Sequence, residues 1–166
     1  MLKKARETDT KGDYRLIRDG DFSQFKQKTY DLVLSAFTFD NVPTMEKKVW
    51  ILRELRKLLK IEGRIVNLVS SPEIHTHEWA SFSTKDFPEN KHAKSGDRVR
   101  IIQKGTEDKR PVEDIILAPD CYREVFKKAG LEIVETHKPL AKKSEPYRWV
   151  NETRIAPWTI YVLRST

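Results

Sequence analysis

The chain has 166 residues, which is about the length of one domain and enough to bury a core. Its 32 basic and 25 acidic residues give a net charge of +7, but no five basic residues follow one another. This pattern indicates a solvated surface, so we expect no nucleic-acid partner. No apolar run approaches the roughly 20 residues of a membrane helix, no signal peptide is expected, and Cys121 is the single cysteine, so we expect a cytoplasmic protein without an intrachain disulfide.

The first thirty residues predict little regular structure. Residues 1–7 are expected to be the end of a helix with Leu2 and Ala5 facing inward. A turn rich in Asp, Thr and Gly follows, then a short strand over Tyr14–Ile17 and a loop at 19–22.

The strongest signal is a strand, helix and strand in the middle of the chain. Tyr30–Ala36 is dense in Leu and Val, Thr44 is a plausible N-cap for a helix over 45–59, Gly63 is expected to end that unit, and Arg64–Val69 forms the next strand. The density of apolar residues predicts strands covered on both faces. Two strands joined by a helix are expected to be parallel, with ligands beyond their carboxyl ends. Those ends are residues 35–43 and 70–79.

The second half alternates regular elements with two irregular excursions. The excursion at 70–96 is long and aromatic, so we expect it to be packed and to be either functional or a cover over another part of the domain. The excursion at 138–156 is expected either to shape a substrate pocket or to form a lid packed on Trp158. Two segments, Val99–Gln103 and Val112–Leu117, are expected to form a hairpin. Pro119 fits the first turn of a helix over Asp120–Ala129, and two strands follow at Leu131–Thr136 and Trp158–Leu163.

His75 and His77 lie in the most chemically dense stretch of the sequence. In an extended segment they share a face with Glu73 nearby, which suggests a general base or a substrate contact. The simpler interpretation is a polar loop folded over the sheet. No further paired His or Cys completes a ligand set, so no metal is expected.

The order and spacing of these segments resemble class I S-adenosylmethionine-dependent methyltransferases. The resemblance rests on Tyr30-Asp-Leu-Val-Leu-Ser35, on Leu55-Arg-Lys-Leu-Leu-Lys-Ile-Glu-Gly-Arg-Ile-Val66, and on Phe126-Lys-Lys-Ala-Gly-Leu131. It implies an α/β fold: a partial Rossmann-like sheet, mixed and mostly parallel, with an antiparallel C-terminal strand at 157–163 and an added hairpin. Residues 1–166 would then be one methyltransferase-like domain.

One feature of that family is missing from the sequence. Its glycine-rich turn, which lets the backbone approach the cofactor, has no counterpart, because no two of the six glycines stand in a Gly-x-Gly spacing. The resemblance therefore implies a domain that is incomplete at its N-terminus and lacks the first two strands. The strand at Tyr30 would have an open edge, which is prone to aggregation. Three outcomes stay open: a truncated product that folds poorly, another chain that supplies the missing strands, or pairing of the strands at Tyr14 and Tyr30 directly or across a dimer. For a well-ordered form we expect a homo-oligomer through that edge.

The resemblance also implies roles for residues near the strand ends. An acid after the third strand would bind the adenine amino group, and either Asp19 or Asp21 fits. Phe37 or Phe39 would wall the substrate side, although plain core packing explains them as well. The implied cofactor-binding residues are Asp19, Gly20, Asp21, Phe22, Ser35, Ala36 and Phe37. The implied substrate-binding residues are Phe39, Trp79, Tyr147 and Trp149, with His75 and His77 as catalytic candidates.

The function implied is S-adenosylmethionine-dependent methyl transfer to a small-molecule acceptor, by this chain or by a longer protein of which it is a part. Two alternatives stay open. The first is a non-catalytic binding or structural remnant of the fold, because half of the cofactor site is absent. The second is a basic nucleic-acid-binding module.

Overall fold

The computed structural model describes residues 2–18 and 20–166, and its larger sheet has the strand order β1-β2-β7-β6. These strands are β1 (Tyr30–Ala36), β2 (Leu59–Ser70), β7 (Trp158–Ser165) and β6 (Leu131–His137). β1 and β2 are parallel, and β7 is antiparallel to both of its neighbours. The predicted mixed α/β sheet with an antiparallel last strand is confirmed.

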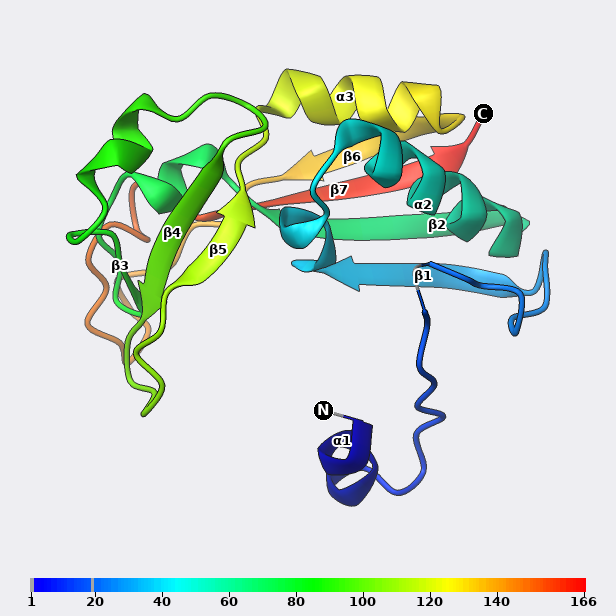
Figure 1. Ribbon diagram of the computed structural model, residues 1–166, viewed down its shortest axis with the longest axis horizontal. Coiled ribbons are helices and arrows are strands. Elements are labelled where there is room, and N and C mark those ends of the chain that lie inside the picture. Colours follow the sequence, from blue (N-terminus) through cyan, green and yellow to red (C-terminus); the bar gives the residue numbers. More distant parts are fainter. Residues whose placement is uncertain (1, 19) are drawn as a thin grey trace.

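Two helices cover one face of this sheet (Figure 1). They are α2 (Met45–Leu58) and α3 (Pro119–Lys128). The side chain of Thr44 caps α2 by accepting a hydrogen bond from the Lys47 amide, as its sequence position predicted. The buried stripes of both helices pack on alternate residues of β2 and β7, and this packing forms the main core.

A second sheet stands beyond the carboxyl ends of β1 and β2 (Figure 1). It has the order β3-β4-β5, with bounds Phe82–Ser83, Arg98–Gln103 and Val112–Ile115. The predicted hairpin is its antiparallel β4–β5 pair. Short 3₁₀ helices turn the chain around this end of the molecule: η1 (Thr38–Asn41), η2 (Pro72–His75) and η3 (Pro88–His92).

The N-terminal segment differs from expectation. Helix α1 (Leu2–Thr8) stands apart from the sheet and buries none of its residues, so Leu2 and Ala5 are not inward-facing core (Figure 1). Tyr14–Ile17 is not a strand. Its backbone meets no strand among the described residues, and Arg6 binds the carbonyl of Tyr14 instead. An extended segment becomes a strand only where another backbone pairs with it.

Strand β1 is less covered than its apolar sequence predicts. Leu34 is 66% exposed and Leu32 is 54% exposed, so the expectation of cover on both faces is wrong for this strand. Gly63 is also not the end of the helical unit, because β2 already begins at Leu59. A Cβ at Gly63 would lie 2.9 Å from the carbonyl oxygen of Tyr30, so glycine allows β1 and β2 to approach closely there.

No helix among residues 2–18 and 20–166 is long and apolar enough to cross a membrane.

Candidate functional site

The chain leaves β1 through a backbone kink at Phe37. Strand alternation would send residue 37 to the helix-covered face, beside Ser35. Instead Phe37 has a φ of 57°, in the left-handed region that non-glycine residues seldom adopt, while its amide donates to the Leu68 carbonyl at 2.9 Å. Its ring is 38% exposed and packs edge-on against Trp158, with ring centroids 4.8 Å apart. The kink therefore brings an aromatic ring to the carboxyl edge of the sheet.

A buried polar network fixes η1, the turn that follows. The Asp40 carboxylate accepts a hydrogen bond from the Ser70 amide, at 3.0 Å to the nearer oxygen, which ties η1 to the end of β2. The ammonium of Lys48, on the first turns of α2, donates to the Phe39 carbonyl. Asp40 and Lys48 are both almost fully buried. Because loss of hydration disfavours both charges, burial raises the pKa of Asp40 to about 6 and lowers the pKa of Lys48 to about 8.

Asp114 on β5 joins the second sheet to this network. Its carboxylate lies 3.2 Å from Nε2 of His75 and accepts a hydrogen bond from the side-chain amide of Asn41 at 3.3 Å. His75 is 2% exposed, and its Nδ1 has no protein partner among the described residues. The network thus links η1, α2, β5 and η2 at one end of the large sheet.

The two histidines do not share a face. His75 points into the buried network, whereas His77 is half-buried and its ring packs edge-on against Trp79 at 6.2 Å. The backbone forms η2 here in place of the extended segment that would align positions i and i+2. A joint action of the two side chains is therefore not favoured by this geometry. No group of three or more His, Cys, Asp or Glu side chains within residues 2–18 and 20–166 is arranged to hold a metal ion.

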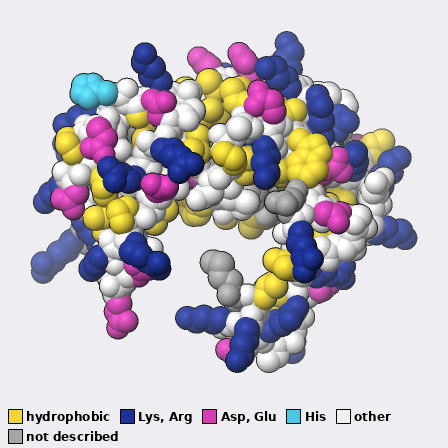
Figure 2. Space-filling model, viewed as in Figure 1, with side chains coloured by type: hydrophobic (Ala, Val, Ile, Leu, Met, Phe, Trp, Pro, Cys, Tyr) yellow, Lys and Arg dark blue, Asp and Glu magenta, His cyan; other side chains and the backbone are white. Residues whose placement is uncertain are grey.

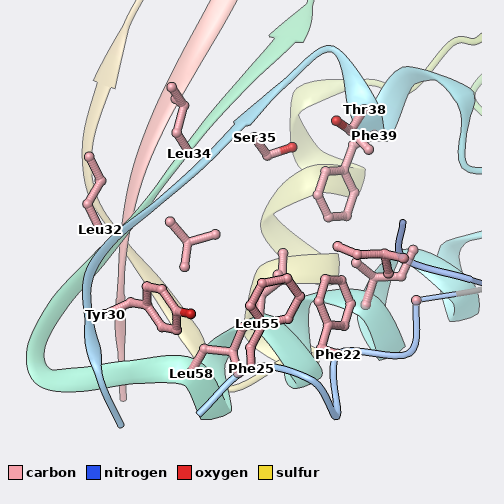
Figure 3. A pocket seen from close by; sticks show the side chains of 14 residues that line it. Phe22, Phe25, Tyr30, Leu32, Leu34, Ser35, Thr38, Phe39, Leu55 and Leu58 are labelled. Atoms are coloured by element: carbon pink, nitrogen blue, oxygen red, sulfur yellow. The ribbon is translucent and has the colours of Figure 1, made fainter. Parts of the chain in front are cut away.

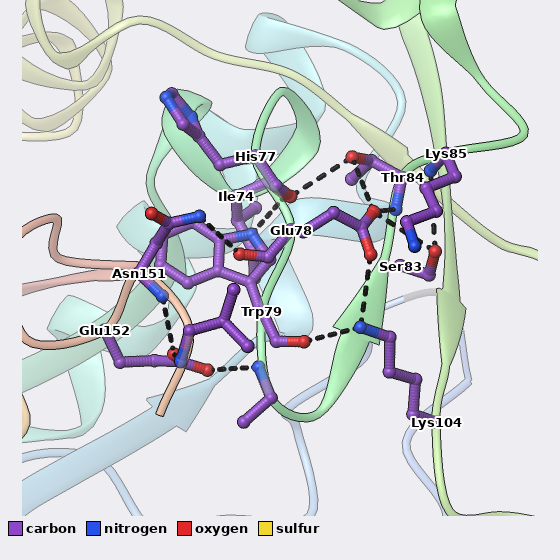
Figure 4. A network of polar contacts seen from close by, with 12 residues as sticks. Ile74, His77, Glu78, Trp79, Ser83, Thr84, Lys85, Lys104, Asn151 and Glu152 are labelled. Atoms are coloured by element: carbon purple, nitrogen blue, oxygen red, sulfur yellow. Dashed lines mark hydrogen bonds and ion pairs between the residues drawn. The ribbon is translucent and has the colours of Figure 1, made fainter. Parts of the chain in front are cut away.

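Glu78 and Trp79 stabilise the first excursion, residues 70–96, through hydrogen bonds within it (Figure 4). The Glu78 carboxylate accepts from the Thr84 amide at 2.6 Å and from Lys104 at 3.1 Å, and these contacts hold its pKa below the usual range despite partial burial. The Trp79 indole is 1% exposed and donates to the Ile74 carbonyl at 2.8 Å. Trp79 is thus a core side chain of this excursion, and it has almost no surface with which to meet a substrate.

A groove of about 500 Å³ runs along the free side of β1 (Figure 3). Phe22, Phe25 and Leu55 gather on one side of it, and Leu34 points away from them (Figure 3). The groove is lined by four residues that the sequence assigned to ligands, namely Gly20, Phe22, Ser35 and Phe39. Phe39 is 1% exposed and belongs to the main core, so core packing accounts for it, as it does for Trp79.

The remaining predicted residues are placed as follows. Asp19 lies outside the described residues. Asp21 caps a local turn by accepting from the Ser23 amide, and a Cβ at Gly20 would meet the Trp50 ring at 2.5 Å, so both have structural explanations. Tyr147 is mostly exposed and Trp149 half-buried, with their rings 4.9 Å apart. Ala36 is exposed beside the β1 end.

Sequence reasoning missed Lys48 and Asp114, and Asp40 lay within the predicted strand end at 35–43 without a role of its own. A signal for Lys48 was available, because it precedes Leu52 by four residues and Leu55 by seven and so falls on the buried stripe of α2. A lysine at such a position needs a partner inside the protein. Nothing comparable marks Asp114, which sits in an ordinary alternating hairpin strand.

Comparison with solved structures returns methyltransferases. A putative S-adenosylmethionine-dependent methyltransferase from Listeria monocytogenes is 16% identical with a TM-score of 0.69, and the match covers 100% of this chain and 75% of that protein. The CcbJ methyltransferase from Streptomyces caelestis is 17% identical with a TM-score of 0.63, again covering 100% and 75%. A SAM-dependent methyltransferase from Leishmania major is 17% identical with a TM-score of 0.60, and this chain, matched over 99%, spans only 51% of it.

These similarities show that the chain has the class I methyltransferase fold. The identities are too low to carry a function with them. No family model and no curated protein matches the sequence.

Proposed function

We propose that this chain forms the acceptor-binding side of an S-adenosylmethionine-dependent methyltransferase that acts on a small molecule. One observation carries the proposal: η1, the second sheet and the aromatic 138–156 excursion all lie at the carboxyl edge of β1 and β2, where sheets of this kind bind ligands (Figure 1). The neighbours in the structure comparison support it, because they are described as methyltransferases dependent on that cofactor.

The residues fit one wall of a cofactor site only. The backbone at Ser35–Phe37 offers that wall at the end of β1. The opposite wall requires a glycine-rich turn, and no two glycines of the sequence stand in a Gly-x-Gly spacing. The free side of β1 meets no further strand among the described residues.

Calorimetry with S-adenosylmethionine tests whether this chain holds only one wall of the cofactor site. We expect weak or no binding by the 166-residue chain, and a micromolar dissociation constant would contradict that expectation. The genomic sequence upstream of Met1 provides the second arm. If it encodes a strand and a glycine-rich turn in frame, the longer protein is expected to bind the cofactor and transfer methyl groups. Binding without transfer to any acceptor would favour the alternative of a non-catalytic remnant.

The charge distribution favours a small acceptor over nucleic acid. Lys and Arg side chains are spread over the face shown in Figure 2, with Asp and Glu between them, and they do not gather into one stripe. A nucleic-acid binder needs basic side chains along a continuous track. Titration with RNA and DNA at two salt concentrations checks this, because a steep loss of affinity with salt would support the nucleic-acid alternative.

The open edge of β1 carries a proposal about assembly. Its backbone groups on that side have no strand partner among the described residues, and Leu32 and Leu34 are exposed beside them. We propose that a second copy of the chain pairs with this edge, since an exposed apolar edge is otherwise prone to aggregation.

A further inference from the structure

A basic pocket of about 680 Å³ lies at the amino ends of β1 and β2, opposite the carboxyl edge on which the proposed function rests. The segment before β1, the end of α2, the start of β2 and the end of β7 contribute to its lining. Four of the lining side chains are cationic and none is acidic, namely Lys28, Arg56, Lys57 and Lys60. Charges of one sign around a pocket attract the opposite charge, so this pocket suits an anion.

Two of the four cations have no carboxylate partner. Lys57 and Lys60 form partly exposed ion pairs, at 2.6 Å and 2.8 Å. Such pairs are weak, so both lysines can turn to a ligand at small cost. Lys28 and Arg56 form no ion pair with any carboxylate of residues 2–18 and 20–166. The protein itself therefore leaves part of the positive charge of the pocket without compensation.

The guanidinium of Arg56 is held in place at the pocket. Arg56 is half-buried, and its Nη1 donates to the carbonyl of Gly130 at 3.2 Å. A Cβ at Gly130 would collide with this guanidinium, so the glycine provides the room that it fills. An arginine has five N–H donors, and within the described residues only this one has an acceptor. A planar group with free donors, already fixed in orientation, is well suited to bind phosphate oxygens.

The end of α2 does not account for these cations. Cations near a helix C-terminus often serve the last carbonyls of the helix. Here the carbonyls of Lys57 and Leu58 accept from the backbone amides of Lys28 and Thr29, at 3.0 Å and 2.9 Å. Backbone donors thus satisfy the last turn, and they tie the segment that carries Lys28 to the helix. The cationic side chains are left for another anion.

The size and the charge of the pocket select the class of ligand. Its volume lies in the range of sites for drug-sized molecules, so a single inorganic ion would leave most of it unfilled. A phosphate group carries up to about two negative charges, so two phosphates match four cations. Leu59 and Ile61 add an apolar part to the lining, and Ser165 and Thr166 add hydroxyl groups. These features together fit a molecule with two phosphate groups and an organic part.

We propose that this basic pocket binds an organic diphosphate, with its phosphate groups at Lys28 and Arg56 and its organic part against Ile61. The pocket lies at the other edge of the sheet from the methyl-transfer site, so its ligand is neither the acceptor nor the cofactor. The proposal does not depend on the proposed function.

Amide spectra of the ¹⁵N-labelled 166-residue chain test this assignment by nuclear magnetic resonance. The probe is uridine diphosphate, which lacks the adenine ring of the cofactor. At low ionic strength it is expected to shift the amide signals of Lys28, Ile61 and Thr166 saturably and to leave those of Ser35 and Phe37, at the carboxyl edge, unchanged. Shifts confined to the carboxyl edge, or no shifts at millimolar probe, would overturn the proposal.

Related probes separate the parts of the ligand. Uridine monophosphate should bind about ten-fold more weakly, because it has one phosphate group for the same four cations, and uridine should not bind. Pyrophosphate keeps both phosphates without the organic part and should bind about five-fold more weakly. Equal binding of the monophosphate, or tighter binding of pyrophosphate, would contradict an organic diphosphate. Tighter binding of a uridine oligonucleotide would mark a nucleic-acid surface instead.

Variants locate the site. Arg56→Gln removes a cation that has no carboxylate partner, and it is expected to weaken binding about ten-fold. Arg53→Gln is the matched control, because Arg53 lies on the same helix and donates to the Lys128 carbonyl but does not line this pocket. It should keep the affinity of the wild type.

Lys28→Gln keeps the test valid if Arg56→Gln unfolds. Lys28 is exposed, so the change should leave the thermal midpoint unaltered and weaken binding about five-fold. An equal loss in Arg53→Gln, or no loss at either position of the pocket, would mean that the net charge of the chain attracts the probe, and would overturn the proposal. No sample contains S-adenosylmethionine, so the calorimetric test of the proposed function stands or fails separately.

Discussion

At the residue scale, the feature with most consequence is a lysine on the buried stripe of a helix. Lys48 is 1% exposed and lies among Phe39, Asp40 and Asp114. No carboxylate of residues 2–18 and 20–166 comes within salt-bridge distance of its ammonium. Its charge is therefore balanced by two carboxylates at longer range and by one carbonyl. Removal of one member of such a network leaves the others buried without compensation, which costs more than the network itself contributes.

Lys48→Met is expected to lower the free energy of unfolding by about 3 kcal/mol at pH 7. Methionine fills a similar volume but leaves Asp40 and Asp114 without a cation. Urea denaturation measures the loss, and Lys47→Met, on the exposed neighbour, should change stability by less than about 0.5 kcal/mol. A similar small effect at position 48 would mean that the network is not ionised in solution.

The raised pKa of Asp40 predicts a distinctive pH dependence. The folded state keeps this proton up to about pH 6, while the unfolded chain releases it near 3.8, so the folded state binds more protons in between. The contribution to stability is present below pH 3.8 and is lost as the pH rises through 6. A shift of roughly two pKa units corresponds to about 3 kcal/mol.

The stability of the wild type minus that of Asp40→Asn should thus fall by about 3 kcal/mol between pH 4 and 7. Urea midpoints at unit pH steps provide the measurement. The pKa of Lys48 is lowered to about 8, so its own loss of a proton begins above this window and does not interfere. A difference that stays flat or rises with pH would refute the assigned direction.

At the element scale, α2 is the helix on which η1 and the network depend. It begins where Thr44 caps it. Thr44→Ala is expected to cost about 1 kcal/mol, because the Lys47 amide loses its acceptor. Thr44→Ser keeps the hydroxyl oxygen and should recover most of this in thermal unfolding. Equal losses in the two variants would point to the methyl group of threonine as the stabilising part.

The elements that could be predicted from the sequence are those whose own residues show a local periodicity of apolar side chains. The stripes of α2 and α3, the β4–β5 hairpin and the strands β1, β6 and β7 follow from local periodicity. Tyr14–Ile17 has similar residues but is not a strand, since strand pairing depends on a second backbone that local sequence cannot reveal. Gly63 was misread for a related reason: its role is a close approach to β1, which only the paired sheet defines.

The sequence predicted where the candidate site lies better than it predicted which side chains meet there. The carboxyl ends of β1 and β2 followed from the parallel connection, and residues there form η1 and η2. Which side chains meet at this edge depends on kinks such as that at Phe37, which moves its ring toward Trp158 across the sheet. His75 and His77 are two residues apart in sequence, and they point to different surroundings because the chain forms η2 there in place of an extended segment.

At the scale of the whole molecule, the large sheet is unevenly covered. Helices α2 and α3 protect one face, whereas β1 offers a free edge and the exposed side chains of Leu32 and Leu34. Burial of those two leucines would contribute on the order of 25 cal/mol for each Å² removed from water. Pairing of one β1 with another would also satisfy backbone groups along the edge.

Sedimentation velocity at micromolar concentration is therefore expected to show a dimer or larger species. Leu34→Lys should shift it toward monomer, because a charge on an edge strand opposes pairing with a second copy. Ile61→Lys is the matched control, since Ile61 is 91% exposed on β2 and lies outside the β1 edge. If the wild type sediments as a compact monomer, the edge does not pair with a copy of itself. If both lysine variants dissociate alike, the contact lies on another surface.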